Sequence, residues 1–224
     1  RAIAGEVGRA LERERWELVE IAGHVERERP DAGATALVRA LTLGRGSNPN
    51  IAKVYLLDAR GRVLAVSPPD PDAHGTDLSR LPYVAAALSS GAVTWSSATV
   101  MMSTGEPRVG LVMPRERGVL LAYLDLSRLI RAVSGDDQGP WARWVALLDR
   151  EGTFLASEDP ALARERVSML DLPLVRRAVH GAEGTAEYVL QGRSYLGSAV
   201  PVVAPGWVVV VAEPVEHAFA AIYR

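Results

Sequence analysis

The chain repeats itself with a period of about ninety residues. The segment LLDARGRVLA at 56–65 returns 91 residues later as LLDREGTFLA at 147–156. The dipeptide Leu81-Pro82 returns at the same spacing as Leu172-Pro173. Landmarks kept at a nearly constant offset over this distance indicate two copies of one structural unit. We therefore expect two similar modules, each with its own core, and not one continuous fold.

Composition narrows the classes of function. The 224 residues are 48% hydrophobic, which is enough for two ordinary cores. The formal net charge is −2, so the chain lacks the excess of basic residues typical of nucleic-acid binding. The absence of cysteine excludes disulfides and thiolate metal sites. The four histidines lie in no recognisable catalytic or metal-binding motif. We expect no cofactor, no metal and no nucleic-acid partner.

The ends of the chain suggest a segment of something longer. There is no initiator Met or signal peptide, and no apolar run approaches the roughly twenty residues that span a membrane. Residues 2–29 predict a long amphipathic helix that ends at Pro30. Such a helix either spans both modules, caps a core or packs against a copy of itself. Its apolar stripe consists of Ile3, Val7, Leu11, Leu18, Ile21 and Val25.

Each module predicts the same order of elements: a hairpin, a helical segment and three strands. A second helix at 34–43 precedes the first module, a linker at 127–139 holds a short helix ending at Gly135, and a closing helix covers 213–224. The first module has strands at 54–58, 63–66, 92–102, 107–114 and 118–124 and a helix at 77–89. The second has strands at 145–149, 154–157, 185–190, 194–200 and 207–212, a helix at 171–180 and a tight turn at 191–193.

This order predicts an α+β fold in which each module is a five- or six-stranded antiparallel sheet with helices on one face. The domain boundaries that we expect are a helical region at 1–45, a first module at 46–130, a second module at 131–213 and a terminal helix at 214–224. The helical segment of each module would lie across its sheet, so that each module could enclose a cavity.

The chain resembles the double Cache (dCache) family, the tandem PAS-like extracellular sensor domains of bacterial transmembrane receptors. The paired LLD-x-x-G hairpins carry this resemblance, together with GTDLS at 75–79 before Leu81-Pro82-Tyr83. TGEP at 104–107, MP at 113–114 and YLDL at 123–126 complete the pattern. The resemblance covers the whole chain, including the long first helix and the short last one.

The resemblance implies a periplasmic or extracellular part of an inner-membrane receptor, tethered to the membrane through both end helices. The length of the first helix also suggests a homodimer through that helix. The module at 46–130 would be distal to the membrane and bind a small molecule such as an organic acid or amine. The module at 131–213 would be proximal and relay the signal. A histidine kinase, chemotaxis transducer or cyclic-dinucleotide enzyme would follow. A ligand-free structural or partner-binding module is the alternative, and a hydrolytic enzyme a more distant one.

Several residues are candidates for the ligand site of the first module. Asp125 matches the Asp with which amino-acid-binding members hold a ligand ammonium, and Tyr123 shares its face of the strand. Asp125 could instead end the strand and cap 127–130. Glu213, which lies 88 residues later at the place expected to be equivalent in the second copy, favours this structural role. Tyr83 matches the aromatic residue of the pocket helix, where it could stack on a ligand or fill the core.

One strand adds a mixed polar and apolar face. Trp95, Ser97, Thr99 and Met101 alternate along it, which suits a small and partly polar ligand, although the hydroxyls could also face solvent. Arg108 could supply a cation from another strand, but the sequence does not determine its direction.

The sequence departs from amino-acid-binding members at one position. They carry an Arg directly before the Pro-aromatic pair, where this chain has Leu81, and Arg80 lies one place earlier. We therefore regard an α-amino acid ligand as doubtful. The acidic loop at 70–77 matches no known cation site and is interpreted as a solvated loop.

Overall fold

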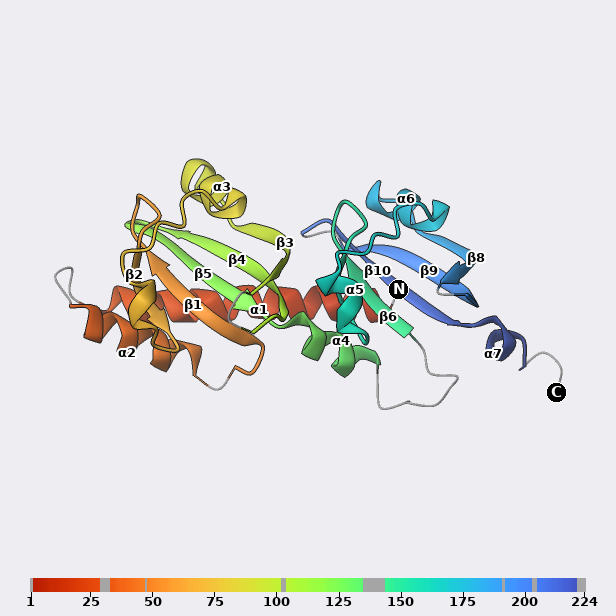
Figure 1. Ribbon diagram of the computed structural model, residues 1–224, viewed down its shortest axis with the longest axis horizontal. Coiled ribbons are helices and arrows are strands. Elements are labelled where there is room, and N and C mark those ends of the chain that lie inside the picture. The colour runs from red at the N-terminus through yellow and green to blue at the C-terminus, as the bar shows by residue number, and fades with distance from the viewer. Residues whose placement is uncertain are drawn as a thin grey trace. The chain divides into compact units, whose positions relative to one another are not determined.

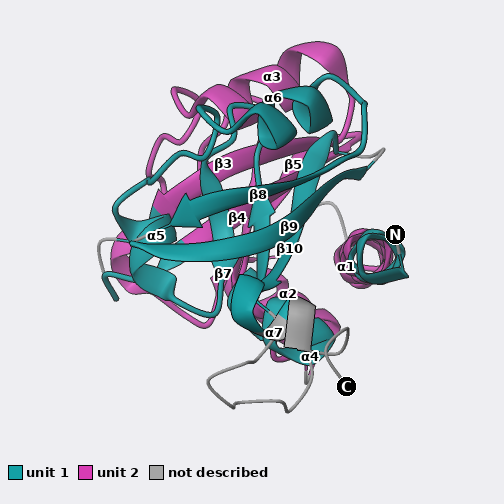
Figure 2. Ribbon diagram, turned by 90° about the vertical axis from the view of Figure 1, so that its right-hand side faces the viewer, with its two compact units in different colours: residues 1–10, 100–107, 126–224 teal, residues 11–99, 108–125 magenta. Residues whose placement is uncertain are grey.

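The computed structural model describes residues 2–28, 33–46, 48–101, 104–134, 144–190, 192–202 and 205–220 (Figure 1). Expectations that fall on Pro30, Met102, Gly135, Gln191 and 221–224 lie outside these residues. The chain forms two compact units, one of residues 1–10, 100–107 and 126–224 (unit 1) and one of residues 11–99 and 108–125 (unit 2) (Figure 2). Each unit contains one five-stranded sheet, which confirms the predicted tandem architecture.

Unit 2 is built around a sheet of strand order β2-β1-β5-β4-β3. Its strands are β1 (Ile51–Leu57), β2 (Val63–Ser67), β3 (Thr94–Val100), β4 (Pro107–Arg115) and β5 (Gly118–Leu124). Its helices are the larger part of α1 (Ala2–Glu26), α2 (Ala34–Arg45), the 3-10 helix η1 (Pro71–Ala73) and α3 (Pro82–Ser90).

Unit 1 repeats this order, with a sheet of order β7-β6-β10-β9-β8. Its strands are β6 (Trp144–Leu148), β7 (Phe154–Ser157), β8 (Gly184–Leu190), β9 (Arg193–Val202) and β10 (Trp207–Pro214). Its helices are α4 (Leu126–Ser134), α5 (Pro160–Arg164), α6 (Pro173–Val179) and α7 (Val215–Ala220). The boundaries of the modules at 46–130 and 131–213 stay a prediction.

The repeated LLD-x-x-G phrase forms the same hairpin turn in both units. The Asp58 carboxylate accepts the backbone N–H groups of Arg60 and Arg62 at 2.8 and 2.9 Å. Asp149 accepts the N–H groups two and four residues further on at 3.0 and 2.8 Å. The glycine three residues after each Asp has a φ of +80° or +71°, which a glycine adopts without strain. The phrase recurs because each half needs this turn.

Helices cover both faces of the unit 2 sheet, and not one face as expected. The Thr42 hydroxyl of α2 lies 3.1 Å from that of Ser67, which stands opposite Val54 in the sheet. On the other face, Tyr83 of α3 reaches Tyr123 of β5. These faces are opposite because the β5 partner of Val54 is the residue before Tyr123. The central strands carry apolar side chains on both faces, so both need a cover.

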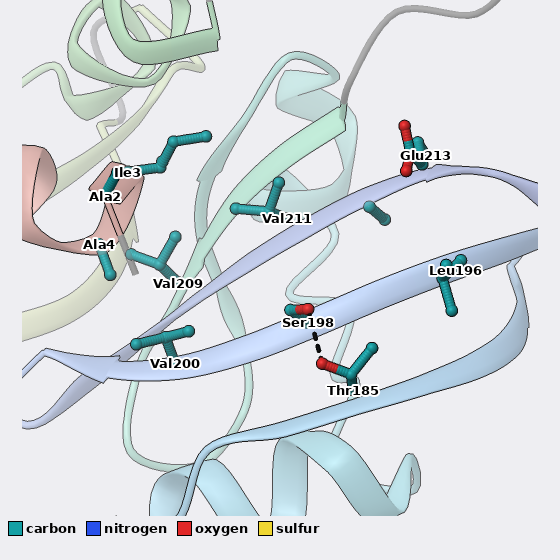
Figure 3. A pocket seen from close by; sticks show the side chains of 11 residues that line it. Ala2, Ile3, Ala4, Thr185, Leu196, Ser198, Val200, Val209, Val211 and Glu213 are labelled. Atoms are coloured by element: carbon teal, nitrogen blue, oxygen red, sulfur yellow. Dashed lines mark hydrogen bonds between the residues drawn. The ribbon is translucent and has the colours of Figure 1, made fainter. Parts of the chain in front are cut away.

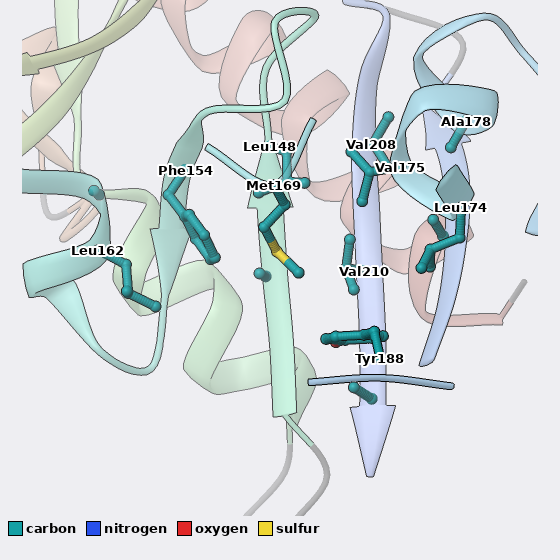
Figure 4. Close-up of a cluster of buried hydrophobic side chains, with 14 residues drawn as sticks. Leu148, Phe154, Leu162, Met169, Leu174, Val175, Ala178, Tyr188, Val208 and Val210 are labelled. Atoms are coloured by element: carbon teal, nitrogen blue, oxygen red, sulfur yellow. The ribbon is translucent and has the colours of Figure 1, made fainter. Parts of the chain in front are cut away.

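The core of unit 1 lies between its sheet and α6 (Figure 4). Phe154, Met169 and Val210 are almost fully buried in it, and α6 adds Leu174 and Val175. Strict alternation along β10 directs Val208 and Val210 into this core.

A buried carboxylate ties α1 to unit 2. Glu14 is 4% exposed and accepts the side-chain N–H groups of Asn48 at 3.0 Å and Asn50 at 2.7 Å. The carbonyl of Asn50 in turn accepts the backbone N–H of Asp125 at 2.7 Å. Charge-assisted bonds to a buried carboxylate are stronger than neutral ones, so this network holds α1 to the start of β1.

Glu14→Ala is expected to lower the free energy of unfolding by about 2 kcal/mol, because it leaves two amide donors without their acceptor. Urea unfolding measures this difference. Glu12 is the matched control, since it pairs with Arg15 at 2.9 Å on a largely exposed surface of the same helix. Glu12→Ala is expected to cost less than about 0.5 kcal/mol, and equal losses for the two variants would contradict the role given to Glu14.

Gly118→Ala is expected to cost about 3 kcal/mol of unfolding free energy, because residue 118 has a φ of +127° and an added Cβ would overlap the carbonyl oxygen of Leu57. Gly91 is the control: its φ is +64° and no atom lies within 4 Å of the added Cβ. Gly91→Ala is expected to cost about 1 kcal/mol. If the two substitutions cost the same in urea unfolding, the described β4–β5 turn is wrong.

Candidate functional site

Three tyrosines form the centre of a polar cluster on the α3 side of the unit 2 sheet. The hydroxyl groups of Tyr83 on α3 and Tyr123 on β5 are 2.7 Å apart. The Tyr123 ring meets that of Tyr55 on β1 edge to face, with centroids 6.0 Å apart and planes at 86°. The side chains of one helix and two strands therefore converge at this point, and Tyr83 and Tyr123, predicted as site residues, are in contact.

The environment keeps the phenols of Tyr83 and Tyr123 neutral. Burial raises the pKa of Tyr123, and its hydrogen bond with Tyr83 raises it further. Burial also raises the pKa of Tyr83, although hydrogen bonds to Tyr123 and to the Thr99 side chain partly oppose this. Neutral phenols can donate and accept hydrogen bonds to a ligand, but they are poor general bases at neutral pH.

An ion pair flanks the tyrosines. Arg108 Nη2 lies 3.5 Å from Asp125 Oδ2, and the two side chains are only 15% and 16% exposed. Gly110 stands opposite Tyr123 in the sheet, so Arg108, two residues earlier, faces the same side. The structure thus shows toward which face Arg108 points, which the sequence left open. The ion pair joins two predicted site residues, Arg108 and Asp125.

A second ion pair was not predicted. Lys53 Nζ lies 2.6 Å from Asp70 Oδ2 and 5.4 Å from the centroid of the Tyr55 ring. Burial disfavours the charged ammonium, but hydrogen bonds to Asp70 and Tyr55 and the charges of both give a net rise in the pKa of Lys53. The hydrogen bond from Lys53, followed by its charge, lowers the pKa of Asp70. Lys53 stands opposite Tyr123, which places it beside the tyrosines.

One sequence signal could have identified this pair. Among the 25 basic Lys and Arg residues of the chain, Lys53 is the single lysine. Asp70 belongs to the loop that the sequence analysis assigned to solvent.

Strand β3 supplies part of the cluster. The side chain of Thr99 hydrogen-bonds to that of Tyr83. Ser96, which was not predicted, is buried, and its hydroxyl accepts the N–H of Gly110 at 2.7 Å. A Cβ at position 110 would lie 3.1 Å from the Tyr83 ring, so glycine allows the helix to approach the sheet here.

The other predicted residues of this strand are less closely connected. Trp95 and Ser97 are half-buried on β3, and their part in ligand binding stays a prediction. Met101 follows the end of β3, and its part in ligand binding also stays a prediction.

The same positions in unit 1 are mostly apolar. The two sheets can be matched strand by strand through their hairpin Asp residues and their registers. The resulting pairs are Lys53 and Trp144, Tyr55 and Ala146, Tyr83 and Leu174, Tyr123 and Ala212, and Arg108 and Tyr195. Unit 1 fills this space with a core, in which Trp144 packs on Phe154 at 5.8 Å and on Tyr195 at 6.5 Å. The polar cluster is therefore particular to unit 2.

The register also corrects one inference from the sequence. Because Tyr123 matches Ala212, the counterpart of Asp125 is Pro214, and Glu213 corresponds to Leu124. The repeat spacing at this strand is one residue longer than the 88 used for the sequence comparison. Glu213 therefore gives no support for a structural role of Asp125 shared by both units.

A cavity of about 340 Å³ lies in unit 1, between the start of α1 and the sheet face that points away from α6 (Figure 3). Ile3, Val200 and Val211 contribute apolar walls, and the hydroxyls of Thr185 and Ser198 are 2.8 Å apart beside them. Glu213 is its charged wall residue. This cavity contains none of the predicted site residues.

Two further features bear on the class of site. Within the ranges that the structure describes, no three His, Cys, Asp or Glu side chains gather as a metal site would require. No helix in those ranges is both long and apolar enough to cross a membrane.

Comparison with solved structures shows where this fold occurs. The ligand-binding domain of the Pseudomonas aeruginosa PAO1 amino acid chemoreceptor PctB, in complex with L-Arg, is 20% identical with a TM-score of 0.74, covering 98% of this chain and 93% of that one. The ligand-binding domain of the Pseudomonas fluorescens chemoreceptor CtaA with L-alanine is 19% identical with a TM-score of 0.73, covering 98% and 95%. The extracellular domain of the putative histidine kinase rpHK1S-Z16 is 18% identical with a TM-score of 0.79, covering 98% and 92%.

Sequence comparison gives the family. A search of curated protein sequences found no match. The family model dCache_1, described as a Cache domain, matches residues 2–222, which is nearly the whole chain. This match agrees with the doubled sheets and the long first helix. The chain belongs to the dCache_1 family of Cache domains.

Proposed function

We propose that this Cache domain senses a small molecule through the polar cluster of unit 2, whose principal members are Lys53, Tyr55, Tyr83, Arg108, Tyr123 and Asp125. The observation that carries this proposal is the contrast between the units, since matched positions of one fold hold charged and phenolic groups in unit 2 and a packed, mostly apolar core in unit 1. A core that needs only stability does not require partly buried ion pairs, which contribute little stability of their own.

The ligand that we propose is a small organic acid or amine. The chemoreceptor domains named above were solved with L-Arg and L-alanine. Unit 2 offers phenolic hydroxyls together with one Arg–Asp and one Lys–Asp pair, so each end of a short polar ligand could find a partner. Leu81 occupies the position before the helix proline and supplies no charge there.

Cache domains of this family are extracellular sensor domains of membrane receptors. We place this one in the periplasm, as part of an inner-membrane receptor whose output is a histidine kinase, a chemotaxis transducer or another effector. We also propose a homodimer through α1, which is supported by the 61% exposed Trp16 and by Val19 on the same helix. Unit 1 would relay the signal.

A direct route leads from the cluster to α1. Asp125 is bonded through its N–H to Asn50, whose side chain donates to Glu14 of α1. A ligand that moves Asp125 relative to Arg108 therefore acts on a residue tied to the long helix. We propose that ligand occupancy changes the packing of α1 through this connection.

A ligand-free structural or partner-binding role is the second candidate. It is favoured by the fact that both ion pairs of the cluster are already closed within the chain. The two functions differ in one observable, because a molecule that binds the native state raises its melting temperature by mass action.

Tyr123→Phe is expected to reduce or abolish the melting-temperature rise that the best compound gives, because it removes a buried hydroxyl from the cluster. The screen covers organic acids, amines, amino acids and nucleobases. A ligand at 100 times its Kd stabilises the wild-type protein by about 2.7 kcal/mol, which differential scanning fluorimetry detects.

Tyr188→Phe is the matched control for this experiment. The Tyr188 hydroxyl is buried in unit 1 and has no hydrogen-bond partner among the residues that the structure describes. Its removal is expected to leave the ligand response intact. A response lost in Tyr188→Phe and retained in Tyr123→Phe would place the site in unit 1. A flat response of the wild-type protein to every compound class would favour the structural role.

A further inference from the structure

Lys53 carries the one primary ammonium side chain of a sequence that otherwise uses arginine at every basic position. An ammonium is a compact point charge with three donors, whereas a guanidinium is a planar fork suited to bidentate pairing. Lys53 is also only 17% exposed, on the same sheet face as the tyrosines. A compact cation placed this way can bind a single carboxylate oxygen beside aromatic rings.

The two partners of the Lys53–Asp70 pair are held very differently. Lys53 lies in β1, which is paired on one side with β2 and on the other with β5. Asp70 lies in the connection between β2 and α3, directly before the three residues of η1, and its side chain is 36% exposed. The pair thus consists of a cation fixed by the sheet and a carboxylate delivered by a loop.

We propose that Lys53 is the anion subsite of the polar cluster in unit 2, that Asp70 fills it in the unliganded protein, and that a small monocarboxylate takes the place of Asp70. This inference rests on the proposed function of unit 2. The existing contact shows what the subsite accepts, since a carboxylate oxygen lies 2.6 Å from Nζ. An ion pair with a partly exposed partner is weak, so an external carboxylate can compete with it.

The surroundings of Lys53 define the rest of the ligand. The Tyr55 ring lies beneath the ammonium, and the Tyr55–Tyr123 pair extends from it. Contact with these aromatic rings favours a carboxylate that carries a short apolar or aromatic group. Acetate has too little apolar surface to gain much from this contact. Propionate and benzoate are therefore the probes, with propionamide and benzamide as neutral analogues of the same shape.

The test measures the Kd of propionate and benzoate by calorimetry for the wild-type protein and two loop variants. Asp70→Asn is expected to tighten binding at least about threefold, because the internal competitor is removed. Asp72→Asn makes the same change of charge in the same loop, and its side chain takes no part in the Lys53 pair. It is expected to leave the Kd unchanged. Lys53→Met is expected to abolish binding, and Lys53→Arg to restore part of it.

A second measurement does not depend on any variant. Reductive methylation with ¹³C-formaldehyde labels Lys53 and the terminal amine and retains their charge. The Lys53 methyl resonance of the labelled protein is expected to shift on addition of benzoate and not of benzamide. No shift with either probe carboxylate contradicts the proposal.

Other outcomes separate this inference from the proposed function. If Asp70→Asn weakens binding as Lys53→Met does, Asp70 is itself a ligand-binding group and the displacement is wrong. If the carboxylates bind and neither Asp70→Asn nor Lys53→Met changes their Kd, or if only amines or amino acids bind, unit 2 remains a sensor and the Lys53 subsite is wrong. If no compound of any class binds, both the subsite and the proposed function are wrong.

Discussion

A polar side chain that points into a covered face of a sheet loses its contact with water and is costly to leave unpaired, and this cost organises unit 2. Its central strands are covered on both sides, so Lys53, Arg108 and Tyr123 project into space that α3 and the neighbouring connections largely close. Each is paired, with Asp70, Asp125 and Tyr83 respectively. These pairs connect three strands, one helix and one loop on this face of the sheet.

The two units show that few side chains separate a polar cluster from an apolar core on the same scaffold. Unit 1 keeps the hairpin turns, the strand order and even the glycine beneath an aromatic ring, where Gly197 meets Tyr188 as Gly110 meets Tyr83. In unit 1, the residues Trp144, Ala146, Leu174 and Ala212 stand at the positions of the polar cluster and fill the space with apolar side chains. The two units thus differ in the side chains that one scaffold carries, and the proposed division into a sensing and a relaying unit rests on this difference. Fold and function are separable here.

The sequence predicted the repeat, the order of elements along the chain and α1, because turns and alternation are local patterns with strong signals. It also named Tyr83 and Tyr123 as site candidates, and the structure brings these two into contact. The sequence alone could not predict which residues of neighbouring strands and loops lie opposite one another. The direction of Arg108 follows from the register of β4 on β5, and the Lys53–Asp70 contact joins a strand to a loop 17 residues away. The counterpart of Asp125 was misassigned because one residue of spacing is invisible without the register. Long-range pairing, and not propensity, decided each of these.

Hydrogen–deuterium exchange with and without the compound that most raises the melting temperature tests the central claim most directly, namely that ligand chemistry belongs to unit 2. Binding protects the amides that a ligand orders or covers. The account predicts protection in β1, β4, β5 and α3, with unit 1 changed less. Protection confined to β6, β9, β10 and α6 would contradict it.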